Sequence, residues 1–243
     1  MVAKIPLVLL PGMLCDAAFW KRQAEALADI CQISVATYGL LNTVAAMAHN
    51  VLVNAPPYFA ICGHSMGGRV AQEIYRTAPG RVIGLALFGT DYRGLANDTE
   101  REREFEDRLA DARRAEQIGM PSYARQWALR VLPPSRHSDR ELVDSIAEMA
   151  ARDSPEVIRA QGHAGAFRRD YGDLLTQIRC PTLICAGALD TLRPIGPHEH
   201  MARTIPDARL VVIPAAGHMM AMEQPRDTCT AMREWIALIS SGA

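Results

Sequence analysis

A serine stands between two glycines in the segment Gly63-His64-Ser65-Met66-Gly67. The apolar run 58–62 precedes this segment, and residues 69–76 follow it with apolar side chains at helical spacing. A strand that passes into a helix without a loop turns sharply, so the two glycine positions have no room for a side chain. The serine at the apex is then strained, and its hydroxyl is exposed. This context is the one that the nucleophile elbow G-x-S-x-G requires.

A serine hydroxyl is a useful nucleophile only when an imidazole takes its proton and a carboxylate fixes the tautomer of that imidazole. Asp190 follows the predicted strand 181–186, and His218 follows the predicted strand 209–213. The chain order is therefore serine, acid, histidine, as in strand-elbow-helix hydrolases. The carboxyl ends of parallel strands meet at one edge of a sheet, so we expect Ser65, Asp190 and His218 to converge there as catalytic residues.

Asp91 is the alternative acid, because it also follows a predicted strand, 82–88. It introduces a helical segment, and an aspartate at such a place is commonly a turn or helix-capping residue. The strand before Asp190 neighbours the strand before His218 in the chain, so their loops leave the sheet side by side. We therefore expect Asp190, and not Asp91, to orient His218.

An ester-cleaving site also needs two backbone N–H donors for the oxyanion that forms during the reaction. One candidate is Met66, which directly follows the nucleophile at the start of a helix, where free N–H groups favour negative charge. The other is Met13, in the loop after the first predicted strand, where Gly12 permits a close backbone approach. His64 is interpreted as a packing residue and not as a base.

The sequence offers little support for a metal or a cofactor. His198 and His200 form an H-x-H pair, but no further cysteine, histidine or glutamate follows at a convincing spacing. The 6 cysteines are scattered, with no C-x-x-C pair, and no G-x-G-x-x-G or Walker pattern is present. We expect no metal, no cofactor and no bound nucleotide.

Strand and helix signals alternate twice along the chain, and a helical segment separates the two series. Residues 1–92 and 171–243 are predicted to form an α/β core with a doubly wound, mostly parallel sheet of about six strands. Predicted strands lie at 5–10, 33–38, 58–62, 82–88, 181–186 and 209–213. Predicted helices include one from Asp16 through Leu27, one over 43–53, one over 198–205 and one over 225–239.

Residues 93–170 are predicted to form a helical cap inserted into this core. The run Glu100-Arg101-Glu102-Arg103-Glu104 indicates a solvated helix face. Two apolar stripes follow in the same segment: Leu142, Ile146 and Met149; then Val157, Ile158 and Phe167. An insertion after a strand's carboxyl end projects over the site, so we expect cap residues such as Trp127 and Leu132 to set substrate size.

Composition narrows the functional class. The 243 residues carry a net charge of -1, which gives no general attraction for nucleic acid or an anionic membrane. The short apolar run near the N-terminus is interpreted as a strand and not as a signal peptide, and no stretch is long enough to span a membrane. We expect a cytoplasmic protein that acts on a small molecule, and its oligomeric state is left open.

The chain resembles the α/β-hydrolase superfamily over nearly its whole length. The resemblance is carried by Leu10-Pro11-Gly12-Met13 with Trp20, by the elbow, by Gly187-Ala188-Leu189-Asp190, and by Gly217-His218. It is similar in particular to small bacterial members with a helical cap, among them carboxylesterases and meta-cleavage C–C hydrolases. Two features depart from the family pattern: Pro11-Gly12 stands where His-Gly is usual, and the chain begins at the third of the family's eight strands.

The resemblance and the motifs together indicate a serine hydrolase of the carboxylesterase type. We expect it to cleave a carboxylic ester or thioester with a small, largely apolar acyl group, through an acyl-enzyme on Ser65. Hydrolysis or lysis of a C–C bond on the same triad is an alternative. A non-catalytic small-molecule receptor is another, because one fold carries many functions.

Overall fold

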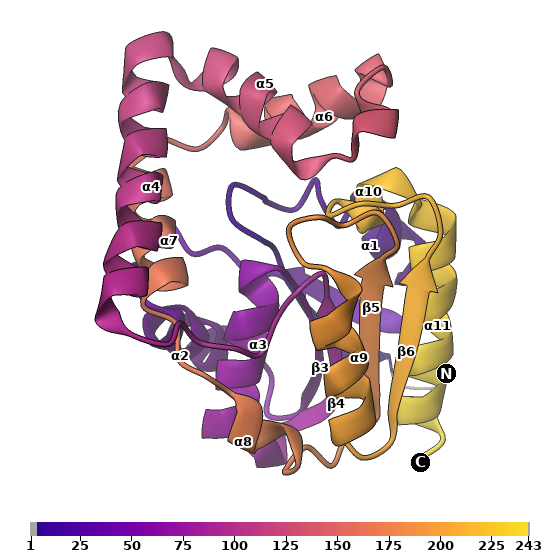
Figure 1. Ribbon diagram of the computed structural model, residues 1–243. Helices are drawn as coiled ribbons and strands as arrows, with labels where there is room; N and C mark the ends of the chain where they lie inside the picture. The colour runs from indigo at the N-terminus through magenta and orange to yellow at the C-terminus, as the bar shows by residue number, and fades with distance from the viewer. Residues whose placement is uncertain (1–3, 243) are drawn as a thin grey trace.

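The computed structural model describes residues 4–242 and contains one sheet of six parallel strands. The strands run in the order β2-β1-β3-β4-β5-β6, so the chain starts one strand from the edge, adds β2 on one side of β1, and then adds β3 to β6 in turn on the other side (Figure 1). The predicted doubly wound, parallel sheet is confirmed. The strands are β1 (Ile5–Leu10), β2 (Cys31–Val35), β3 (Phe59–His64), β4 (Val82–Phe88), β5 (Thr182–Gly187) and β6 (Ala208–Ile213).

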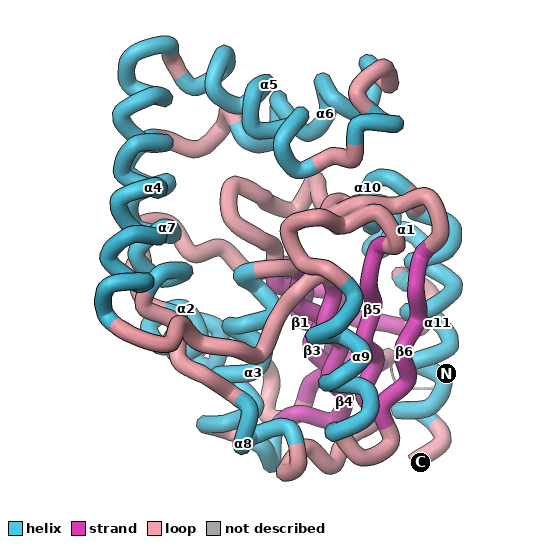
Figure 2. The backbone as a smooth tube through the Cα atoms, in the orientation of Figure 1, coloured by secondary structure: helices cyan, strands magenta, loops and turns pink. Residues whose placement is uncertain are grey.

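The central strands are apolar because both of their faces are covered. Every residue of β3 and β5 is buried, which a strand with one solvent face could not achieve. Helices α1 (Lys21–Leu27) and α11 (Pro225–Ser240) pack against each other on one face. Helices α2 (Val44–Asn54), α3 (Met66–Thr77) and α9 (Ile195–Thr204) cover the other, and α8 (Gly172–Leu175) lies near its lower end (Figure 2).

Between β4 and β5 the described chain forms helices joined by loops, and it contains no strand. Before α8 these elements are α4 (Asp98–Ile118), α5 (Met120–Val131), the short 3₁₀ turn Pro134–Arg136, α6 (Arg140–Ala150) and α7 (Pro155–Ala166). Helix α4 packs along α7, and α5 packs along α6. In Figure 1, α5 and α6 lie beyond the end of the sheet to which the strand arrows point. The short helix α10 (Met220–Glu223) lies at the same end.

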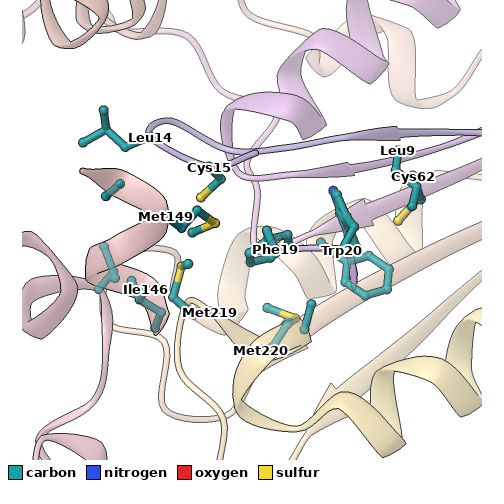
Figure 3. Packing of buried hydrophobic residues seen from close by; sticks show 14 of the residues in the cluster. Leu9, Leu14, Cys15, Phe19, Trp20, Cys62, Ile146, Met149, Met219 and Met220 are labelled. Carbon is teal, nitrogen blue, oxygen red and sulfur yellow. The ribbon is translucent and has the colours of Figure 1, made fainter. Parts of the chain in front are cut away.

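The helical segment is joined to the core by an apolar contact (Figure 3). Ile146 and Met149 of α6 lie beside Leu14 and Cys15, which belong to the loop after β1, and near Met219. All of these side chains are buried within one continuous apolar cluster. The predicted stripe Leu142, Ile146 and Met149 therefore faces the core.

Some expected boundaries were wrong for local reasons. The helix after β1 begins at Lys21 and not at Asp16, because the Asp16 carboxylate accepts a hydrogen bond from the N–H of Ala18 and closes a turn instead. Phe167 lies just after α7 and is 44% exposed, so it does not extend the apolar stripe of Val157 and Ile158.

Over residues 4–242, none of the helices is sufficiently long and apolar to cross a lipid bilayer.

Candidate active site

The elbow has the backbone that its sequence predicts. Ser65 joins β3 directly to α3 with φ 52° and ψ -111°, a conformation that a non-glycine residue rarely adopts. A side chain at Gly63 would overlap the backbone of Gly67. A side chain at Gly67 would instead overlap the backbone of Leu10 at the end of β1. The second glycine is thus needed for packing against the neighbouring strand as well as for the turn.

Ser65, Asp190 and His218 lie together at the carboxyl edge of the sheet. The Nε2 atom of His218 is 3.0 Å from the Ser65 hydroxyl, and its Nδ1 atom is 2.8 Å from Oδ2 of Asp190. Since an ionised carboxylate only accepts hydrogen bonds, Nδ1 carries the proton and Nε2 is left free to accept one from serine. The three predicted residues therefore make the two contacts that serine activation requires.

The Asp190 carboxylate is buried and held in its charged form. Burial alone would raise the pKa of Asp190, but His218 and the backbone N–H groups of Leu192 and Arg193 outweigh it and lower the pKa. The Asp190 side chain is 0% exposed and that of His218 is 8% exposed, so solvent does not weaken their interaction.

Asp91 is engaged elsewhere. Both of its carboxylate oxygens accept hydrogen bonds from the guanidinium of Arg93, with a closest distance of 2.7 Å. One of them also accepts from the backbone N–H of Arg93, as in an aspartate turn. Its carboxylate makes no hydrogen bond to His218.

Two backbone N–H groups near the serine donate no hydrogen bond to any residue between 4 and 242. In the loop after β1, the N–H of Leu14 donates to Gln161 and that of Cys15 donates to the Gly12 carbonyl. The N–H of Met13 lacks an acceptor among residues 4–242, and so does the N–H of Met66 at the start of α3. Gly12 lies so close to Ser65 and His64 that a side chain there would meet both.

His64 supports the histidine loop and does not act on the serine. Its Nε2–H donates to the backbone carbonyl of His218 at 2.9 Å, and its ring stacks on Phe19 at a centroid distance of 4.2 Å. Burial lowers the pKa of His64 well below its usual value, so the ring stays neutral at pH 7. The interpretation of His64 as a packing residue agrees with these contacts.

Glu223 is a residue of the site that the sequence did not indicate. Its carboxylate accepts hydrogen bonds from the backbone N–H groups on either side of His218, from Gly217 at 2.9 Å and from Met219 at 3.0 Å. The side chain is buried, and burial raises its pKa to about 7. No spacing rule for a single sequence distinguishes this glutamate from a surface residue of a short helix.

A cavity of about 190 Å³ opens above Ser65 and His218, between the core and the helical segment. One part of its wall is apolar and is formed by Met13, Met66, Trp127, Val131, Leu192 and Met219. Leu132, which was expected beside Trp127, does not line the cavity and is buried in the apolar cluster instead. The remaining wall is charged, because five arginines also line the cavity: Arg69, Arg108, Arg130, Arg168 and Arg193.

The two histidines of the H-x-H pair point to different surroundings. His198 is buried, with Nδ1 3.1 Å from the carbonyl of Pro194, whereas His200 stacks on Tyr92. Within the described part of the chain, no group of three or more histidine, cysteine or carboxylate side chains is arranged to hold a metal ion.

Comparisons with known proteins agree with this architecture. Residues 7–231 match the family model of the alpha/beta hydrolase family. An esterase from Thermogutta terrifontis, described with malate bound, is 32% identical; the match covers 98% of this chain and 91% of that one, with a TM-score of 0.84.

Two curated relatives are more distant. The pimeloyl-[acyl-carrier protein] methyl ester esterase of Chromobacterium violaceum is 25% identical over 95% of this chain and 82% of its own length. A protein of Azorhizobium caulinodans, provisionally named carbamate hydrolase RutD, is 25% identical over 92% of this chain and 88% of its own length. On the family match and the Thermogutta likeness, this chain belongs to the alpha/beta hydrolase family.

Proposed function

We propose that this chain is a serine hydrolase that cleaves a small carboxylic ester or thioester through an acyl-enzyme. The observation that carries the proposal is the continuous hydrogen-bonded series from Ser65 Oγ through His218 to Asp190 at the floor of a cavity. The names of the Chromobacterium and Thermogutta relatives, both esterases, support the same bond class.

Each residue has one task in this reaction. The Oγ of Ser65 attacks the carbonyl carbon while Nε2 of His218 takes its proton, and Asp190 stabilises the imidazolium that forms. The carbonyl oxygen becomes negative and is bound by the N–H groups of Met13 and Met66. The intermediate then collapses, and the alcohol or thiol leaves with the proton from His218. Water repeats the sequence on the acyl-enzyme and releases the acid.

The cavity limits the acyl group. Its volume of about 190 Å³ is below the roughly 300 to 1,000 Å³ of pockets for drug-sized ligands. Trp127 and Val131 of α5 lie on its wall, so the helical segment contributes directly to the space available for the acyl chain. We therefore propose that residues 93–170 act as a cap that sets substrate size.

The proposal is tested with a fluorophosphonate probe and p-nitrophenyl esters of increasing acyl length. We expect labelling at Ser65, located by mass spectrometry of the tryptic peptide, and turnover that is fastest on short esters. Ser65→Ala should abolish both, with little change in stability because the hydroxyl packs against little. Retention of labelling in that variant would remove Ser65 from the mechanism. Labelling without turnover of any ester or thioester would favour a C–C bond substrate or a receptor.

A further inference from the structure

The cavity contains more positive charge than its carboxylates compensate. Of the five arginines on its wall, Arg168 is paired with Glu104, at 2.7 and 2.8 Å. Arg108 and Arg130 both contact Asp111. Arg69 and Arg193 make no ion pair with any residue between 4 and 242, and they are the two arginines closest in sequence to the triad residues Ser65 and Asp190.

Arg69 is a buried guanidinium with one protein partner. Its side chain is on the cavity wall, the residue is 3% exposed, and its Nη1–H donates to the backbone carbonyl of Arg93 at 2.9 Å. An arginine side chain carries five N–H donors, so most of its hydrogen-bonding capacity is unused by the described residues. A buried charge in this condition costs free energy unless a partner compensates it.

The position of Arg69 in the helix makes the residue still more unusual. It lies in the first turn of α3, four residues after Ser65. The partial positive charge at a helix N-terminus favours anions and disfavours an arginine. Both the burial of this charge and its place at a helix N-terminus are energetically unfavourable. Residues that break local rules in this way are expected at functional sites.

Arg193 adds a second unpaired guanidinium. It follows Asp190 by three residues, lines the cavity, and has a buried Nε–H without an acceptor among the described residues. Its Nη1–H donates only to the adjacent carbonyl of Leu192.

The two arginines also affect each other electrostatically. Burial, together with the charges of Arg168 and Arg193, lowers the pKa of Arg69 to about 9. The Arg69 guanidinium therefore remains charged at pH 7 and is repelled by these two neighbours.

We propose that Arg69 and Arg193 bind an anionic group of the substrate, so that the natural substrate is an ester or thioester that also carries a carboxylate. This inference rests on the hydrolase function proposed above and specifies its substrate class. An anion at this place would accept hydrogen bonds from the unused N–H groups, and its negative charge would compensate the positive charges of both arginines. Guanidinium groups bind carboxylates through two parallel hydrogen bonds, which also fix orientation.

The spacing limits the length of the substrate. Four residues of helix advance by about 6 Å, so the Arg69 backbone lies about that far from Ser65 along α3. Ser65, Arg69 and Arg193 also line the same cavity of about 190 Å³, so the substrate that we propose is short, as in half-esters of four- or five-carbon dicarboxylic acids. The carboxylate can belong to the acyl part or to the alcohol part, and the substrates below separate these two cases.

The first experiment compares matched substrates that differ in charge. Monomethyl glutarate is paired with methyl pentanoate for the acyl part, and 3-acetoxypropanoate with propyl acetate for the alcohol part. We expect wild-type kcat/KM to favour the charged member of one pair by at least tenfold. Arg69→Gln and Arg193→Gln should each reduce that ratio tenfold or more, because a charged hydrogen-bonded pair is lost. Arg69→Lys keeps the positive charge but lacks the planar guanidinium group, and it should retain part of the preference for the charged substrate.

The control is Arg125→Gln, which removes the same charge from an exposed residue of α5 that does not line the cavity. It should leave the ratio unchanged. Equal losses on both members of a pair in Arg69→Gln and Arg193→Gln would assign these arginines to structure and overturn the proposal. Arg193 is only half-buried, so its variant remains informative if Arg69→Gln does not fold.

A second measurement separates this proposal from the proposed hydrolase function. Glutarate binding to the Ser65→Ala protein is measured by calorimetry and compared with Ser65→Ala/Arg69→Gln and with Ser65→Ala/Arg125→Gln. If the Ser65→Ala/Arg69→Gln protein fails to bind glutarate while the other two proteins bind it, the anion site is supported, even if the wild-type protein cleaves no ester. Ester cleavage with no charge preference in either pair and no glutarate binding would overturn the anion site while leaving the hydrolase function intact.

Discussion

The side-chain carbonyl oxygen of Gln161 accepts a hydrogen bond from the backbone N–H of Leu14 at 3.0 Å. Gln161 belongs to α7, 147 residues along the chain from Leu14, which follows β1 and has a positive φ of 56°. A second contact joins the same regions, between the guanidinium of Arg152 and the carboxylate of Asp16 at 2.7 Å. The helical segment thus holds the loop that carries the proposed oxyanion donor Met13.

Gln161→Leu should lower kcat about tenfold or more on every ester and change KM little. Without an acceptor, the buried N–H of Leu14 costs about 1 to 3 kcal/mol, and the loop is no longer held with the N–H of Met13 toward the site. Gln161→Glu keeps an acceptor and should restore most of the rate. The control is Gln117→Leu on the exposed face of α4. An unchanged kcat in Gln161→Leu would show that the loop keeps its geometry without this contact.

Exchanging the two candidate acids tests which one orients His218. Asp190→Asn should lower kcat by more than about 10² near pH 7, because the amide favours the wrong imidazole tautomer. Asp91→Asn should lower kcat much less, since Asp91 contacts Arg93 and not His218. Both variants are assayed on p-nitrophenyl acetate after their folding has been checked by circular dichroism. The reverse order of effects would assign the role to Asp91.

The glycine at the end of the elbow can be tested by stability. Gly67→Ala places a methyl group on the backbone of Leu10, which cannot move aside within the sheet, so we expect a loss of about 3 kcal/mol or more in unfolding free energy. Gly80→Ala has nothing within 4 Å of the added carbon and should change stability by less than about 1 kcal/mol. Urea denaturation measures both values. Similar stabilities for the two variants would contradict the packing seen at Gly67.

Trp127 and Leu132 are both buried residues of the helical segment, but they face different surroundings. Trp127→Leu enlarges the cavity and should shift the preference from acetate toward longer esters such as octanoate. Leu132→Ala should cost about 2 to 5 kcal/mol of stability and leave the acyl-length preference unchanged, because Leu132 does not line the cavity. The two variants are compared by the ratio of kcat/KM on octanoate and acetate. A shift of that ratio only in Leu132→Ala would contradict the assignment of the wall to Trp127.

The sequence predicted the elements with strong periodic or motif signals. Local sequence patterns indicate the apolar runs of β3 and β5 and the chain order of Ser65, Asp190 and His218. These patterns can be recognised without knowing which residues meet in the folded protein. Gln161, Glu223 and the arginine wall depend on which side chains meet across the fold. Nothing in the periodicity of α7 shows that one glutamine reaches Leu14. Arg69 had a usable signal, since a cation in the first turn of a helix opposes the dipole.

The same difference explains why the sequence did not indicate the charged part of the cavity wall. Apolar residues of the cap were read as the substrate wall because apolar residues usually surround ligands. In the structure, many of them pack against the loop after β1 and the histidine loop (Figure 3). Arg108 and Arg168, which also belong to this segment, line the cavity.

Glu223 gives the protein a specific dependence of stability on pH. Its folded-state pKa of about 7 lies above the usual value of about 4.3. The folded state therefore holds the proton more tightly, and the stability that this supplies is complete below about pH 4.3 and lost as pH rises through 7. A shift of this size corresponds to at most about 4 kcal/mol. Glu223→Gln cannot titrate, so this loss should be absent from its unfolding free energy between pH 5 and pH 8.

The measurement is the difference between wild type and Glu223→Gln in urea denaturation at pH 5, 6, 7 and 8. The opposite contribution of His64, whose lowered pKa favours the folded state at higher pH, is common to both proteins and cancels in that difference. Glu223→Gln should also lower kcat by about tenfold, because an amide oxygen cannot replace both carboxylate acceptors at Gly217 and Met219. Glu102→Gln on the exposed face of α4 is the control for both measurements. A difference that does not change with pH would show that Glu223 remains ionised throughout and acts only as an acceptor for the two N–H groups beside His218.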